Sequence, residues 1–266
     1  NVFSVTQELK YSLDHENRLD LTLFVNGIPV ITMELKNPLS GQSVQNGIRQ
    51  YQNDRDPKEK IFSFARCMVH FAADTELVYM CSHLKGKKTD FLPFNKGLND
   101  GTSIPPFGKG NPLNPNGLKT HYLWEEILSK DSLSNIIEQF AQIAEETDED
   151  TGKKTKKMIF PRYHQLTSVR KILEHTKHHG LGQKYLIQHS AGSGKSNSIT
   201  WLAHQLISLF DESGENHIFD SVIVVTDRTV LDRQLRDNIK QFAQIKGIVE
   251  AITGEGTSKT NQLKEA

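Results

Sequence analysis

The first third of the chain shows short runs of β-branched and apolar residues separated by polar turns, a pattern typical of β-strands. The runs are NVFSVTQEL (1–9), RLDLTLFV (18–25), PVITMELK (29–36), MVHFAAD (68–74) and TELVYMCSHL (75–84). Between the third and the fourth run, Val44, Ile48 and Tyr51 recur at helical spacing, which predicts a helix over about residues 42–51. We therefore expect one helix packed on a mostly antiparallel sheet.

Two segments of different character follow. Residues 97–117 hold five glycines and four prolines, which oppose both helix and ladder formation and predict a long surface loop. Asp131 is placed to cap a helix that runs to Phe140. The stretch EETDEDTGKKTKK at 145–157 contains no apolar residue, so we predict a linker there and a first domain over residues 1–144.

The spacing of apolar residues changes after the linker. Helices are predicted over 162–175, 195–210 and 231–242, and apolar runs at 185–189 and 221–225 predict strands between them. Alternation of strands and helices is typical of a parallel sheet covered by helices. The predicted fold class is therefore α/β, with a mixed sheet and helices in the first domain and the start of a parallel sheet in a second domain over residues 158–266.

Composition excludes several classes of protein but selects none. Lys+Arg and Asp+Glu are both 32, so net charge gives no sign of a nucleic-acid partner. Cys67 and Cys81 form no CxxC pair, which disfavours a zinc site or a disulfide framework and predicts buried apolar thiols. No run approaches the roughly 20 apolar residues that span a bilayer, and the N-terminus is not a signal peptide, so we expect a cytoplasmic protein without a membrane partner. The ends of the sequence suggest a piece of a longer chain.

The strongest motif is a phosphate-binding loop. Gly192, Ser193, Gly194, Lys195 and Ser196 follow an apolar run and open a predicted helix, the setting that a P-loop requires. Glycines let backbone N–H groups surround phosphates, and the helix N-terminus adds positive potential. Lys195 is expected to reach the β- and γ-phosphates of ATP, and Ser196 to ligate Mg²⁺.

Two features around this loop point to a motor. His189 replaces the first glycine of the pattern GxxxxGK(S/T), a departure that matches helicase-like motors, so the second domain is expected to be the first part of a RecA-like helicase motor. Upstream, Arg162 and Gln165 open the preceding helix, about 30 residues before the loop, and resemble the adenine-binding residues of helicases. They are therefore candidate ATP contacts.

Downstream, Arg228 and Arg233 follow the apolar run at 221–225 and are candidate contacts to the DNA backbone. A solvated helix face explains them equally well. No Asp-Glu pair follows that run to act as a Walker B acid, and no second motor lobe supplies an arginine finger. We therefore expect this piece to bind nucleotide without turning it over.

A second constellation lies in the first domain. Asp20 falls on one predicted strand and Glu34 and Lys36 on the next, in a D-x13-E-x-K pattern that resembles the PD-(D/E)xK nuclease core. Two carboxylates can hold a divalent cation on the scissile phosphate, and a lysine on the same strand face can orient or activate water. The spacing of Glu34 and Lys36 places them on one face, because strand side chains alternate. An exposed hairpin face with charged residues is the competing interpretation.

The form of the turn between these two strands decides whether Asp20 lies on the same face as Glu34 and Lys36. A strict two-residue Asn26-Gly27 hairpin would pair Val25 with Ile28, set Asp20 opposite Met33 and turn it away from Glu34. A three-residue loop with a G1 bulge at Gly27 would restore a common face, and we expect an offset of that parity.

Several blocks resemble, in order, the restriction subunit of type I restriction-modification enzymes. They are NRLD with FVNGIPVITMELKNP, LPFN, PRYHQL, HSAGSGKSNSITWLAHQL and VVTDRTVLDRQL. The resemblance implies an ATP-driven translocase of double-stranded DNA in the prokaryotic cytoplasm. It would cleave DNA far from its recognition site and work with separate methyltransferase and specificity subunits.

The resemblance also carries over individual residues. Asp20, Glu34 and Lys36 fall on the nuclease positions, with Mg²⁺ held by the two carboxylates, and Lys195 falls on the P-loop lysine. A Gln-x-x-x-Tyr motif of the family is matched only at its tyrosine, Tyr51, which can also be a packing aromatic. Gly47 stands in place of the glutamine, and Gln45 and Gln50 are the two candidates to replace it.

Two other functions remain open at this stage. A DNA-repair helicase with an appended nuclease would share both motif sets but lack the HSAGSGKSNSI and PRYHQL blocks. A nucleotide-gated DNA-binding module with a degenerate nuclease face would show Asp20 turned away from Glu34 and would take up no metal.

Overall fold

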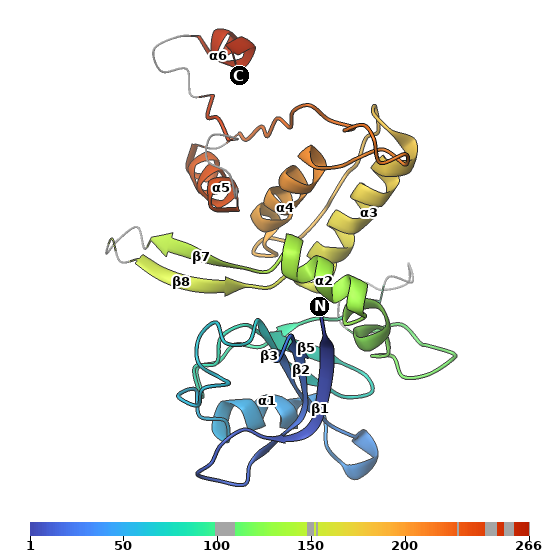
Figure 1. The fold of residues 1–266 in the computed structure, drawn as a ribbon, viewed down its shortest axis with the longest axis vertical. Helices are drawn as coiled ribbons and strands as arrows, with labels where there is room; N and C mark the ends of the chain where they lie inside the picture. Colours follow the sequence, from blue (N-terminus) through green and yellow to red (C-terminus); the bar gives the residue numbers. More distant parts are fainter. Residues whose placement is uncertain are drawn as a thin grey trace. The chain divides into compact units, whose positions relative to one another are not determined.

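The structure is a computed structural model that describes residues 1–98, 110–147, 152, 154–227, 229–242, 249–252 and 258–265. The chain divides into two compact units, Asn1–His164 and Gln165–Ala266 (Figure 1).

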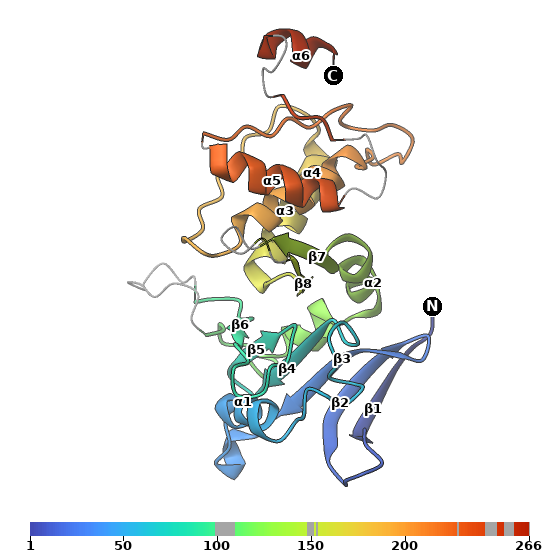
Figure 2. The same cartoon turned by 90° about the vertical axis from the view of Figure 1, so that its left-hand side faces the viewer.

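A six-stranded mixed sheet organises the first unit, with strand order β1-β2-β3-β4-β5-β6 (Figure 2). Its elements up to the last strand are β1 (Phe3–Lys10), β2 (Arg18–Val25), β3 (Ile28–Leu35), η1 (Pro38–Ser40), α1 (Val44–Asn53), β4 (Val69–Ala73), β5 (Val78–Cys81) and β6 (Leu92–Pro93). Only β3 and β4 pair in parallel; the other neighbours are antiparallel. The five strand runs and the helix predicted from the sequence are confirmed.

The parallel pair forms the buried centre of this sheet, because the connection between its strands carries a helix that covers one face. All five residues of β4 are buried, and α1 packs on β3, β4 and β5. The first turn of α1 is capped from two sides: the Asn46 side chain accepts from the Ser43 N–H at 2.9 Å, and Asp74 accepts from the Val44 N–H at 2.7 Å. These caps satisfy N–H groups that lack helical partners.

The rest of the first unit contains a helical segment and a hairpin. Its elements are η2 (Leu123–Ile127), α2 (Lys130–Gln139), β7 (Gln142–Thr147) and β8 (Lys154–Ile159). Ser129, not Asp131, is the N-cap of α2, and Asp131 lies in its first turn, where a carboxylate also complements the helix dipole. Of the predicted loop at 97–117, the described residues 97–98 and 110–117 form no helix or strand; residues 99–109 lie outside the described part.

The charged segment predicted as a linker at 145–157 is not free of regular structure. Strands β7 and β8 pair antiparallel across it, with Glu145 opposite Lys156 and Thr147 opposite Lys154. Glu145 faces the oppositely charged Lys156, a pair that favours strand pairing without apolar side chains and that a search for apolar periodicity does not detect. The division between the units falls later, after His164.

In the second unit the described residues form helices but no strand ladder. The helices are α3 (Tyr163–His179, whose first two residues belong to the first unit), α4 (Lys195–Ile207), α5 (Thr229–Phe242) and α6 (Lys259–Glu265). Its α4 and α5 pack on one another, with Trp201 buried and edge-on to Phe242.

The parallel sheet predicted for the second domain is therefore absent from the described residues of this unit. The runs at 185–189 and 221–225 have no regular secondary structure, and apolar side chains within them are exposed, 93% for Leu186 and 86% for Val225. An apolar run becomes a strand only when a neighbour pairs with its backbone N–H and C=O groups. The described residues of this unit supply no such neighbour to either run.

Two predictions from composition concern burial and the membrane. Cys67 and Cys81 are both free and buried, as predicted. No helix in the described residues combines the length and apolarity needed to cross a bilayer.

Candidate functional site

The β2–β3 hairpin decides whether the predicted nuclease residues share a face. Val25 pairs with Ile28, so the turn is the strict two-residue form, with Asn26 and Gly27 both at positive φ (50° and 79°). The predicted three-residue turn is therefore wrong. Leu23, however, pairs with Ile31 while Phe24 pairs with Pro29, which leaves one extra residue, Val30, as a β-bulge within β3.

This bulge shifts the register by one residue, which places Asp20 on the same face as Glu34 although the turn is the two-residue form. Beyond it, Leu21 pairs with Met33 and Thr22 with Thr32, and the same register places Asp20 opposite Glu34. Pro29, next to the extra residue, has no N–H to donate to a ladder, and this makes a bulge at that point inexpensive. Asp20, Glu34 and Lys36 thus lie on one face of the hairpin.

The three side chains approach one another closely. Asp20 Oδ2 accepts a hydrogen bond from the Leu35 backbone N–H at 2.6 Å. The Lys36 ammonium lies 3.5 Å from Asp20 Oδ2 and 3.7 Å from Glu34 Oε2. Glu34 is fully buried, whereas Asp20 is partly exposed. The structure therefore brings together the carboxylates and the lysine that the sequence pattern predicted.

An arginine that the sequence analysis did not select completes the cluster. Arg55, in the turn after α1, donates from Nε to Glu34 Oε1 at 2.8 Å, and its Nη2 lies 2.7 Å from the same oxygen. Glu34 Oε2 is buried and has no hydrogen-bond partner. Burial raises the pKa of Glu34 to about 7; the Arg55 cation opposes this rise, the Asp20 carboxylate adds to it, and Lys36 opposes it.

Tyr51 lies behind this cluster. Its hydroxyl and the Thr32 hydroxyl are 2.8 Å apart, and Thr32 also lies 2.7 Å from His70 Nδ1. The Tyr51 ring is completely buried and packs against Phe62 and His70. Burial raises the pKa of Tyr51 well above its usual range, so the hydroxyl stays protonated. Its described contacts are those of a packing and positioning residue, and its predicted catalytic role stays a prediction.

His70 gives a testable pH dependence. Burial lowers its pKa to about 3, against about 6.5 in an unfolded chain. Between these values the unfolded state holds one proton more than the folded state, so the His70 contribution to stability is complete above pH 6.5 and decreases as pH falls. We expect the free energy of unfolding of the wild type, relative to His70→Asn, to fall by about 1.4 kcal/mol per pH unit between pH 6 and 4. Denaturant unfolding of both proteins across this range measures it, and parallel curves would contradict it.

The glycine at position 47 brings α1 close to the sheet. A Cβ added there would lie 3.3 Å from Ala72 Cβ and 3.5 Å from the Glu34 carbonyl oxygen. A side chain at this position would need Ala72 or the helix to give way slightly, so glycine suits the close contact between α1 and the sheet. Gln45 is exposed and Gln50 half-buried, and which of them replaces the missing glutamine stays open.

The oxygen atoms of the cluster suit a divalent cation. Mg²⁺ binds oxygen ligands, keeps several waters and is often held by one or two carboxylates together with substrate phosphate. Glu34 Oε2 offers a buried oxygen without a hydrogen bond, and Asp20 offers a second carboxylate on the same face. The described residues contain no group of three or more His, Cys, Asp or Glu side chains suited to a metal. The pair therefore fits a cation whose remaining ligands are water and substrate.

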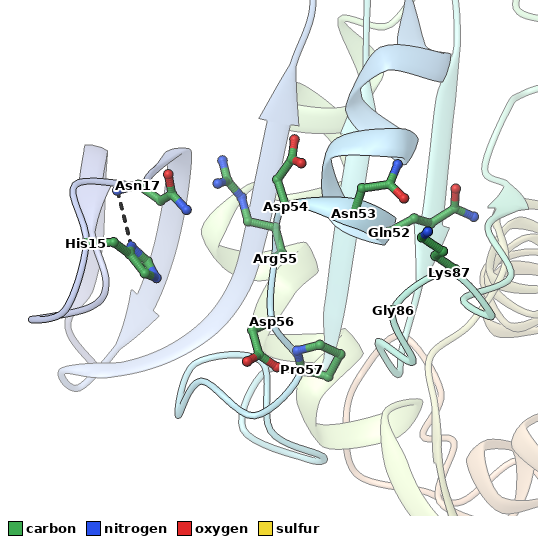
Figure 3. Close-up of a pocket in the computed structure, with 10 residues that line it drawn as sticks. All are labelled: His15, Asn17, Gln52, Asn53, Asp54, Arg55, Asp56, Pro57, Gly86 and Lys87. Carbon is green, nitrogen blue, oxygen red and sulfur yellow. Dashed lines mark hydrogen bonds between the residues drawn. The ribbon is translucent and has the colours of Figure 1, made fainter.

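A polar depression lies beside the cluster, between the β1–β2 loop, the end of α1 and the loop at residues 86–87 (Figure 3). Its lining residues are His15, Asn17, Gln52, Asn53, Asp54, Arg55, Asp56, Pro57, Gly86 and Lys87. Arg55 is the residue that it shares with the carboxylate cluster. Because its lining holds the carboxylates of Asp54 and Asp56 as well as the cations of Arg55 and Lys87, the depression has no clear preference for the DNA backbone.

In the second unit, the predicted phosphate-binding loop lies directly before α4. Gly192 and Gly194 have positive φ values of 71° and 81°. A Cβ at Gly194 would lie 2.4 Å from Gln165 Nε2, which donates to the Gly194 carbonyl at 2.8 Å. The loop therefore needs glycine at this position, both for its backbone conformation and for the close approach of Gln165.

The lysine of this loop contacts the loop itself. Lys195 Nζ donates to the carbonyl oxygens of His189 at 3.1 Å and Ser190 at 2.8 Å. Because the Lys195 side chain is exposed and α4 starts at this residue, both the ammonium and the helix N-terminus are available to an anion. The arrangement is suited to phosphate.

The other residues predicted for the motor lie in or near the helices of the second unit. Ser196 lies in the first turn of α4 and is half-buried. Burial lowers the pKa of Arg162, which precedes α3. Arg233 is exposed on α5, and Arg228 lies outside the described residues. The predicted roles of these residues stay predictions.

Two family models match the chain, one in each unit. Residues 1–89 match the model described as type I restriction enzyme R protein N terminus, and residues 164–266 match the SWI2/SNF2 ATPase model. The first match contains Asp20, Glu34 and Lys36, and the second contains the phosphate-binding loop.

Curated relatives align over most of the chain. The putative type I restriction enzyme MjaVIIIP endonuclease subunit of Methanocaldococcus jannaschii is 26% identical over 244 residues, covering 90% of this chain and 21% of the relative. The MjaVIIP subunit of the same organism is 27% identical and covers 89% of the chain and 21% of the relative. The type I restriction enzyme HindI endonuclease subunit of Haemophilus influenzae is 24% identical and covers 85% and 20%. The chain spans about a fifth of the length of these relatives.

Proposed function

Because this chain belongs to the family of type I restriction enzyme R subunits and matches their N-terminal part, we propose that it carries a metal-dependent DNA nuclease site followed by the start of an ATP-driven DNA motor. The whole protein would cleave unmethylated double-stranded DNA after ATP-dependent translocation. It would act in the prokaryotic cytoplasm with methyltransferase and specificity subunits.

One observation carries the nuclease half of the proposal. Glu34 Oε2 is a buried acceptor without a hydrogen bond, on the same face as Asp20 and within 3.7 Å of the Lys36 ammonium. Asp20 and Glu34 would hold Mg²⁺, and a bound cation would supply Lewis-acid polarisation of the scissile phosphate. Lys36 would orient the attacking water and lower the cost of charge that develops on the phosphate. These residues are the proposed PD-(D/E)xK-like site.

The motor half rests on the loop before α4. Backbone N–H groups from Gly192 to Ser196 and the α4 N-terminus would bind the ATP phosphates, with Lys195 leaving its carbonyl partners for the γ-phosphate. Gln165, which already contacts this loop, is the proposed adenine contact together with Arg162, and Arg228 and Arg233 are proposed DNA contacts. The match to an ATPase model over residues 164–266 supports this assignment.

The two alternatives are weaker on specific grounds. A degenerate nuclease face predicts Asp20 turned away from Glu34, whereas the Val30 bulge supports a shared face. A DNA-repair helicase-nuclease would not account for the match of residues 1–89 to an R-protein model.

The test uses the full-length protein with its methyltransferase and specificity partners. Mg²⁺ and ATP are added to unmethylated and methylated plasmids that carry the recognition site. We expect cleavage of the unmethylated plasmid only, and only with both Mg²⁺ and ATP. Cleavage that ignores methylation or proceeds without ATP would reject the type I assignment.

A further inference from the structure

The most informative feature outside the sequence motifs is the way Arg55 holds Glu34. Two of its nitrogens, Nε and Nη2, lie 2.8 Å and 2.7 Å from a single carboxylate oxygen, Oε1. The other oxygen, Oε2, accepts no hydrogen bond. The two oxygens of this buried carboxylate therefore differ: Oε1 is bound to the Arg55 guanidinium, whereas Oε2 is left without a hydrogen bond.

The arginine is itself fixed by neighbouring strands. Its Nη2 donates to the Arg18 carbonyl at 2.7 Å, and its Nη1 to the Tyr11 hydroxyl at 3.4 Å. The guanidinium carbon also lies 5.6 Å from the centre of the Tyr11 ring. Arg18 begins β2 and Tyr11 follows β1, so Arg55 joins three consecutive strands at the level of Glu34. A guanidinium held at this many points has little freedom to move.

The buried negative charge of Glu34 explains why it needs the contact with Arg55. Glu34 is completely buried, and the Arg55 side chain is only 3% exposed. A buried carboxylate without a close cation or donors is costly, and it would turn or recruit another partner to reduce that cost. The Lys36 ammonium, 3.7 Å from Oε2, is too far for a good hydrogen bond and does not replace Arg55.

We propose that Arg55 is a positioning residue of the nuclease site, which occupies Glu34 Oε1 and thereby presents Oε2 on the Asp20 face as a metal ligand. This inference rests on the proposed nuclease function and adds to it a residue that lies outside the D-x13-E-x-K pattern. Hydrogen-bonding partners of metal ligands commonly change metal affinity by about 10- to 100-fold.

The test measures Mn²⁺ binding to the full chain by electron paramagnetic resonance, without DNA, with competition by Mg²⁺. In Arg55→Gln, which removes the charge and the two-nitrogen contact, we expect the Mn²⁺ dissociation constant to rise by about 10- to 100-fold. In Arg55→Lys, which retains the charge but has one nitrogen, we expect a smaller rise. Circular dichroism and thermal unfolding verify that each variant is folded.

Two controls separate positioning from general effects. Arg49→Gln removes a cation from the exposed face of α1 without touching Glu34. Tyr11→Phe removes the outer hydrogen bond of Arg55 but keeps its contacts with Glu34. Both should bind Mn²⁺ within about threefold of the wild type, well under the effect expected for a metal-ligand partner.

The outcomes are distinguishable. If the wild type binds Mn²⁺ and both folded variants, Arg55→Lys and Arg55→Gln, bind it with the same affinity as the wild type, the inference is overturned and the nuclease proposal is left intact. Absence of Mn²⁺ binding by the wild type would overturn the metal site and the inference together. If Arg55→Gln does not fold, the comparison of Arg55→Lys with the wild type decides: an unchanged constant overturns the inference.

Discussion

Asp20→Ala is expected to lower DNA cleavage by the assembled enzyme at least about 100-fold, or about 2.7 kcal/mol of transition-state stabilisation, while ATP hydrolysis remains near the wild-type rate. Asp20 supplies one of the two carboxylates on the hairpin face, and Mg²⁺ relies on few protein ligands. Loss of one ligand therefore removes a large share of what holds the cation on the phosphate.

The separation of the two activities makes this result diagnostic. Asp20 belongs to the unit Asn1–His164, whereas the phosphate-binding loop belongs to Gln165–Ala266. Plasmid cleavage and DNA-stimulated phosphate release are measured side by side. Glu16→Ala, which removes an exposed carboxylate just before β2, is the matched control and should keep both activities. Normal cleavage by Asp20→Ala would eliminate this cluster as the active site.

Lys195→Ala is expected to abolish ATP hydrolysis and, with it, translocation, by at least about 100-fold. The Lys195 ammonium now lies against two loop carbonyls and is the cation placed to meet charge on the transferred phosphate. Because cleavage would follow translocation, it should be lost as well, in contrast to Asp20→Ala, where hydrolysis survives.

Phosphate release in the presence of DNA measures this effect. Lys184→Ala, a change at an exposed lysine of the same unit outside the loop, should hydrolyse ATP as the wild type does. Wild-type hydrolysis by Lys195→Ala would refute the motor assignment.

The sequence predicted most of the first unit because its strands are short runs of β-branched and apolar residues between polar turns. It also identified Asp20, Glu34 and Lys36, but it misplaced the irregularity that brings them to one face. Asn26-Gly27 permits both a strict turn and a bulged one, and only the pairing of Phe24 with Pro29 shows that the extra residue is Val30. Proline in a strand was the available signal for a nearby bulge.

Arg55 was not predictable in the same way. It lies in the polar turn after α1, where no periodicity assigns a direction to a side chain, and 21 residues separate it from Glu34. Its role depends on a tertiary contact that exists only when α1 packs on β3.

The predicted strands at 185–189 and 221–225 failed for a different reason. Their apolar content was identified correctly, but ladder pairing depends on neighbours that periodicity cannot supply. The structure shows both segments with exposed apolar side chains instead, including Leu186 and Val225.

The most direct test of the nuclease site is to locate a cation by anomalous X-ray scattering in crystals of the chain soaked in Mn²⁺. We predict an anomalous peak at Glu34 Oε2 and the Asp20 carboxylate in the wild type, and its loss in Asp20→Ala. A peak at other residues only, or one that persists unchanged in Asp20→Ala, would contradict it.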